Sequence, residues 1–425
     1  MFSFERNILL YIYTFLLFLL FLDSMYIYYL WNVNNIFLGI VTLILSIMLI
    51  LGRHVELEVN SKCLWFAVLL FTSLMFGSYE NGFTYYFRMI IKALNIAVLL
   101  SFASEEKQFV LNFITKGFAL ILGVSLTVFL LLYIFELPDN GMLSYDDDRY
   151  LFVNYFVYIK NINDIAIPRF NAVFLEPGHV GMIIAFLLYA NRFNFKSNYI
   201  KILFISLIFT WSLAGYVLTA IGFFLYLLMG TNSLVTRLSR IVVYLALIAS
   251  VVYVNSVDND EGVSFVSEDN ILGQLIINRL ELDEEKFIAG NNRTTQVVDD
   301  DFEKAVDDGT IIMGIGGDEF VKRKETEVGF TGSGYKMYIL QRGIIGTILM
   351  LLTYIIVVRT HVNRKYMTGM LILYMASFLQ RAYPIWEAWL IPFICCSDFV
   401  ANEEDEEDDE DYVLPEQTQT DGLTS

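Results

Sequence analysis

Ionisable residues interrupt an otherwise apolar stretch at residues 167–179, which reads Ile-Pro-Arg-Phe-Asn-Ala-Val-Phe-Leu-Glu-Pro-Gly-His. Ionisable groups at the start of a membrane-like apolar run are energetically costly, so they are functional candidates by default. The planar guanidinium of Arg169 can bind a phosphate through two parallel hydrogen bonds. Glu176 can take a proton from an attacking hydroxyl if burial raises its pKa. A structural interpretation is also open, in which Glu176 is an acidic residue at a helix start whose first turn holds Pro177.

Four further cations are candidates for binding an anionic substrate. Arg88 and Lys92 are four residues apart in an apolar run, so a helix places them on one face. They either reach for the membrane surface or line a shared polar pocket. Arg293 precedes a predicted helix that Thr294 or Thr295 caps and that ends near Asp308, where Gly309 follows. A helix start is a natural anion site, and Arg279 is a similar candidate in the same long segment.

A metal or cofactor site is not expected. The chain has three His and three Cys, and two of the Cys are adjacent, which suits neither a metal site nor a disulfide framework. The runs Asp146–Asp148 and Asp299–Asp301 are typical of solvated loops. His179, one turn into an apolar run, is typical of packing, and it is also a candidate substrate-binding residue.

These residues are positioned by long apolar runs, which predict an all-α integral membrane protein with about twelve spans. Hydrophobic residues make up 56% of the chain, above the roughly 45–50% of soluble domains. Backbone groups in lipid must pair within their own segment, so each span is helical. The expected spans are 8–30, 36–51, 63–78, 83–103, 108–136, 173–191, 199–212, 214–230, 240–255, 337–358, 367–380 and 385–398.

Lys and Arg in the short loops set the orientation, because such residues favour the cytoplasmic side. Twelve spans with both termini inside place nearly all of these cations inside, and the short outer loops retain only Arg381. The predicted division of the chain is a five-span bundle (1–136), a first extracytoplasmic loop (137–172), spans six to nine (173–255), a large and partly helical extracytoplasmic loop (256–335), spans ten to twelve (336–398) and an acidic cytoplasmic tail of disordered composition (399–425).

The order of several motifs resembles the O-antigen polymerase family. An Arg followed by Glu-Pro at a span start (169–177) is similar to that family, as is the small Ser-containing turn at 209–216. The glycine motifs at 313–316 and 343–346 resemble its large-loop exit. The related O-antigen ligases have a His near that exit, whereas this chain has Ser333-Gly334-Tyr335-Lys336, which favours a polymerase.

The resemblance implies a layout like that of C-type glycosyltransferases in the bacterial cytoplasmic membrane. It implies an enzyme that joins polyprenyl-pyrophosphate-linked sugar units on the outer face, without a metal ion or other cofactor. Arg169 and Glu176 are its expected catalytic residues, and Tyr335 and Lys336 join the cations and His179 as substrate-binding candidates. Membrane lipid, a chain-length regulator and a flippase are expected partners, and nucleic acid is not. A ligase, a flippase or transporter, and a membrane scaffold remain alternatives.

Overall fold

The computed structural model describes residues 2–33, 35–58, 61–76, 83–145, 150–162, 169–229, 295–327, 330, 332–361, 363–379, 381 and 383–396. The described chain is mostly helical. Its first half contains α1 (Phe2–Ser24), the short η1 (Tyr28–Leu30), α2 (Asn35–Leu51), α3 (Ser61–Met75), α4 (Phe83–Ser101), α5 (Ser104–Leu131), α6 (Pro177–Ala190), α7 (Asn198–Phe209) and α8 (Leu213–Met229). Its second half contains α11 (Gln296–Asp307), η3 (Thr310–Ile312), α12 (Gly317–Thr326), α13 (Gly334–Thr360), α14 (Arg364–Phe378) and α15 (Glu387–Cys395).

The helices follow the apolar runs of the sequence. Each expected span coincides with one helix, except the ninth, at 240–255, which lies outside the described residues. Among the described helices, α5 and α13 are long and apolar enough to cross a membrane. The acidic tail also lies outside the described residues.

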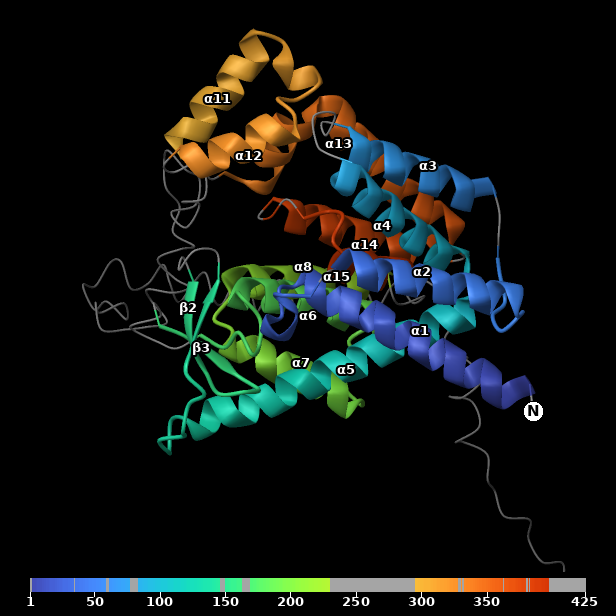
Figure 1. Cartoon of the computed structure of the whole chain (residues 1–425), viewed down its shortest axis with the longest axis vertical. Helices are drawn as coiled ribbons and strands as arrows, with labels where there is room; N and C mark the ends of the chain where they lie inside the picture. Colours follow the sequence, from blue (N-terminus) through green and yellow to red (C-terminus); the bar gives the residue numbers. More distant parts are fainter. Residues whose placement is uncertain are drawn as a thin grey trace, which may run out of the picture.

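A small antiparallel sheet stands in the first predicted loop, where no regular element was expected. Its strands are β1 (Met142–Tyr145), β2 (Tyr150–Asn154) and β3 (Ile159–Asn161), in the order β1-β2-β3. Met142 pairs with Val153 and Phe152 with Asn161. The sheet lies at the opposite end of the helices from the N-terminus (Figure 1). It carries Tyr150 into the neighbourhood of α6.

Helix α6 is the centre of the bundle. All its residues except Gly178 are buried, as expected for a helix that is apolar on every side. Its approach to α8 depends on two glycines, because a Cβ on Gly215 would lie 2.9 Å from the Cα of Gly181. Small residues at such a crossing allow two backbones to approach closely. This packing fixes the start of α6 relative to the turn between α7 and α8.

The segment 295–316 docks on a kink in α13. Thr295 is the N-cap of α11 and Gly309, with φ 78°, follows its last turn, as the sequence predicted. Gly343 is non-helical, with φ 70° and ψ 176°, and it interrupts the backbone hydrogen bonds of α13. The carbonyls of Leu340 and Gln341 then accept hydrogen bonds from the N–H groups of Ile315 and Gly316, at 2.8 and 3.1 Å. The two glycine motifs therefore contact each other directly.

Candidate functional site

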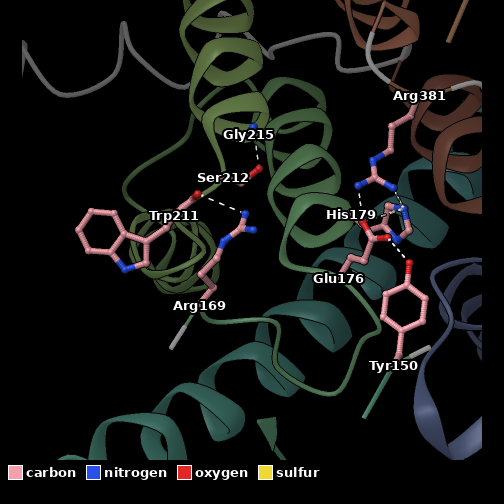
Figure 2. Close-up of polar contacts among 8 residues, drawn as sticks. All are labelled: Tyr150, Arg169, Glu176, His179, Trp211, Ser212, Gly215 and Arg381. Carbon is pink, nitrogen blue, oxygen red and sulfur yellow. Dashed lines mark hydrogen bonds and ion pairs between the residues drawn. The ribbon is translucent and has the colours of Figure 1, made fainter. Parts of the chain in front are cut away.

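Glu176 is the N-cap of α6, and its side chain points away from the helix toward other elements. Its backbone is extended, Pro177 occupies the first helical turn, and the carboxylate makes no capping hydrogen bond. Its Oε1 accepts a hydrogen bond from the hydroxyl of Tyr150 on β2 at 3.2 Å. Its Oε2 forms an ion pair with Arg381, from the segment between α14 and α15 (Figure 2). The structural interpretation of Glu176 as a simple helix-start residue is therefore incomplete.

Arg381 joins Glu176 to His179. Its second terminal nitrogen lies 2.8 Å from Nε2 of His179, one turn into α6. His179 is almost fully buried and is flanked by the rings of Tyr26, Tyr383 and Trp386, whose centroids lie 6.5, 5.5 and 5.4 Å away. The contacts fix both the guanidinium and the imidazole.

The ion pair changes what burial means for Glu176. Burial alone would disfavour the ionised carboxylate. The positive charge of Arg381 beside Oε2 and the hydrogen bond from Tyr150 to Oε1 favour the ionised form. The carboxylate therefore holds Arg381, and its role as a general base stays a prediction.

Arg169 is not brought to Glu176. Its Nε and a terminal nitrogen donate to the carbonyls of Thr210 and Trp211, at 3.4 and 3.3 Å, at the end of α7. Figure 2 shows the guanidinium pointing at this turn. Trp211 has φ 48°, an uncommon conformation for a non-glycine residue. At the start of α8, Ser212 Oγ accepts a hydrogen bond from the N–H of Gly215 at 3.2 Å. A cation at a helix C-terminus stabilises the free carbonyls there.

Arg88 and Lys92 line one polar cavity, as their spacing on one helix face predicted. The cavity has a volume of about 310 Å³, near the lower limit of ligand pockets. We call it the α4 cavity. Lys92 forms an ion pair of 2.8 Å with Glu387, the first residue of α15. Asp23, in the last turn of α1, also lines the cavity and lies within electrostatic range of both cations. Its wall includes four aromatic residues, Tyr26, Trp31, Tyr145 and Trp386.

Two of these aromatic residues connect the α4 cavity to the Arg381 contacts. Tyr26 and Trp386 line the cavity and pack against each other, with centroids 5.3 Å apart, and both also contact His179. Tyr26 follows α1 and has a left-handed backbone conformation, with φ 56°. The next residue, Ile27, forms an antiparallel β-bridge with Phe174, which fixes this part of the chain. The cavity and the cluster of Glu176, His179 and Arg381 therefore adjoin each other across a shared aromatic wall.

Tyr335 and Lys336 lie at the start of α13 and contact other helices. The hydroxyl of Tyr335 donates to the carbonyl of Met375 at 3.0 Å. Lys336 forms an ion pair of 2.5 Å with Asp299 of α11. Neither residue lines the α4 cavity. Arg279 and Arg293 lie outside the described residues.

Metal-binding clusters are absent from the described part of the chain, since no three His, Cys, Asp or Glu side chains there are arranged to hold an ion. Within the run Asp299–Asp301, Asp301 pairs with Arg323 at 2.7 Å. Residues 146–148 lie outside the described residues.

Three charged residues of the site were not singled out from the sequence as site residues. Arg381 was notable only as the lone cation of the short outer loops, and that isolation was the available signal. Asp23 and Glu387 each stand at the end of an apolar run, as Glu176 does. A charge at the end of an apolar run is therefore the sequence signal for Asp23 and Glu387.

The comparisons identify no relative. No protein-family model, no curated protein and no solved structure matches the chain.

Proposed function

We propose that this protein is a multi-spanning membrane enzyme of a bacterial cytoplasmic membrane that polymerises a surface polysaccharide. Its substrates are polyprenyl-pyrophosphate-linked repeat units on the outer face. One unit is the donor, whose pyrophosphate leaves, and a second unit is the acceptor, whose hydroxyl attacks. The resemblance to O-antigen polymerases and the chemistry of the candidate site support this proposal.

Apolar side chains on the outside of the helices support membrane embedding. Phe37, Leu64, Trp65 and Leu120 are each more than half exposed, on α2, α3 and α5. Large apolar side chains exposed on several helices are expected where those helices face lipid. Twelve spans with both termini in the cytoplasm remain part of the proposal.

The observation that carries the proposal is the α4 cavity with the adjoining ion pair of Glu176 and Arg381. It gathers cations and carboxylates at the ends of apolar helices, close to where the small sheet packs. In the proposed orientation this end is outside the cell, where nucleotide sugars and ATP are not supplied. A donor must then arrive already activated and membrane-bound, which a polyprenyl pyrophosphate satisfies.

The residues of the site have distinct proposed roles. Arg88 lines the cavity and makes no hydrogen bond or ion pair with any described residue, so its charge is available for the leaving pyrophosphate. Arg381, which Glu176 and His179 orient, adds a fixed positive charge beside the α4 cavity. Arg169 holds the turn between α7 and α8 in the conformation that activity requires. Arg279 and Arg293 stay proposed phosphate ligands.

A deletion strain tests the proposal. We expect loss of long-chain polysaccharide and accumulation of single lipid-linked repeat units on the outer leaflet. Complementation with Glu176→Gln or Arg169→Ala, each checked for membrane insertion, should not restore long chains. Normal chain length in both variants would contradict the assignment.

The same strain separates the alternatives. Lipid-linked polymer, rather than single units, would indicate a ligase. Single units confined to the inner leaflet would indicate a flippase.

A further inference from the structure

The α4 cavity combines features suited to a sugar ring. The side chains of Trp31, Trp386 and Tyr26 line it, and aromatic rings stack on the C–H groups of pyranoses. Polar groups that can bind hydroxyls stand among them, including Asp23 and Asn95. The volume of about 310 Å³ suits one or two sugar residues rather than a whole repeat unit with its lipid.

Asn95 provides independent evidence of a binding site. It is 3% exposed, its Nδ2 donates to the carbonyl of Gly39 at 2.9 Å, and its Oδ1 is buried without a hydrogen-bond partner. A buried acceptor without a partner is unfavourable, so it points to a donor supplied by a ligand. A sugar hydroxyl is such a donor.

The three carboxylates near the cavity differ in their cation partners. Glu176 is paired with Arg381, and Glu387 with Lys92. Asp23 forms no ion pair within 4 Å with a described residue and has a hydrogen bond from the side chain of Asn35. It also lies in the last turn of α1, where the helix dipole disfavours an anion, whereas Glu387 lies in a favourable first turn. Of the three, Asp23 is the carboxylate best suited to accept a proton.

We propose that the α4 cavity binds the acceptor sugar and that Asp23 takes the proton from its attacking hydroxyl. This inference rests on the proposed function. The O–H bond of the acceptor breaks and its proton goes to the Asp23 carboxylate. The acceptor oxygen bonds to the anomeric carbon of the donor. The bond from that carbon to the pyrophosphate breaks, and its electron pair leaves with the pyrophosphate beside Arg88. Asp23 then returns the proton to water.

The test separates turnover from binding. The substrate is the lipid-linked pool extracted from the deletion strain, and the binding probe is the oligosaccharide released from that pool by mild acid. The probe lacks the leaving group, so it binds without turnover. Purified Asp23→Asn should extend the pool about 10²–10⁴-fold more slowly than wild type. Its affinity for the probe should stay within about threefold.

Two further variants test the sugar site itself. Trp31→Ala removes a stacking face and Asn95→Leu removes the buried acceptor, and each should weaken probe binding about tenfold. Asp139→Asn is the matched control, because Asp139 is exposed in the turn before β1 and lies outside the cavity. It should keep wild-type turnover and binding.

Each outcome is informative. Wild-type turnover in Asp23→Asn overturns its role. If Glu387→Gln then loses turnover with binding intact, Glu387 is the base instead. Unchanged probe binding in both Trp31→Ala and Asn95→Leu overturns the sugar site. If wild-type protein binds the probe but does not extend the pool, the proposed polymerase function fails together with the role of Asp23, while the sugar site stands.

Discussion

The ion pair between Glu176 and Arg381 gives a quantitative test of the site. The side chains are 24% and 15% exposed, so both are mostly removed from water. Removing one partner of a buried pair leaves an uncompensated charge and costs about 3–5 kcal/mol. Partial exposure of Glu176 reduces this, so we expect Glu176→Gln and Arg381→Gln each to destabilise the protein by about 2–3 kcal/mol.

The double variant Glu176→Gln/Arg381→Gln leaves no unpaired charge. Its destabilisation should therefore be about the same as that of either single variant, which corresponds to a coupling of about 2–3 kcal/mol. Unfolding of the purified protein in detergent by a graded denaturing surfactant, followed by tryptophan fluorescence, measures all four states of the cycle. Arg381→Lys keeps the charge but loses the planar fork, so an intermediate value is expected.

Polymer length should follow the same cycle only in part, because the double variant is about as stable as either single variant but lacks the positive charge beside the cavity. Additive destabilisation in the double variant would refute the pairing. Full activity in Arg381→Gln would refute its proposed electrostatic role.

Three other substitutions test the docking and support of the site. Gly314→Ala places a Cβ 2.5 Å from the carbonyl oxygen of Gln341, whereas Gly309→Ala, at nearly the same φ, meets nothing within 4 Å. We expect Gly314→Ala to be less stable than Gly309→Ala by about 1–3 kcal/mol in surfactant unfolding, and equal stabilities would argue against the docked turn. Arg342 is 4% exposed and donates to the carbonyls of Ser73 and Phe76 at the end of α3. Arg342→Met should therefore cost about 2–3 kcal/mol, and an unchanged unfolding midpoint would contradict this contact. Lys336 and Asp299 are 38% and 40% exposed, so Lys336→Met should cost no more than about 1 kcal/mol. Shortened polymer with unchanged stability would support Lys336 as a substrate-binding residue.

The helices were predictable because their signal is local. Apolar runs fixed their positions, Thr295 and Gly309 marked the ends of α11, and a spacing of four put Arg88 and Lys92 on one face. Each of these inferences depends on residues within a few turns of one another.

The pairings within the site were not predictable because they join distant segments. Arg381 is 205 residues from Glu176, and Lys92 meets Glu387 only after α4 and α15 pack together. The charge beside the Glu176 carboxylate comes from that first pairing, so the sequence alone could not show which group holds it. The short strands of the sheet also lacked a signal, because their stability depends on pairing with each other.

Reconstitution tests the central claim most directly. Wild-type protein is placed in liposomes with lipid-linked units extracted from the deletion strain, without ATP, nucleotide sugars or added metal. We expect lengthening of the glycan, with one polyprenyl pyrophosphate released for each unit joined, and only from units on the face that carries Arg88 and Arg381. Lipid-linked units that stay single, with no polyprenyl pyrophosphate released, would contradict it.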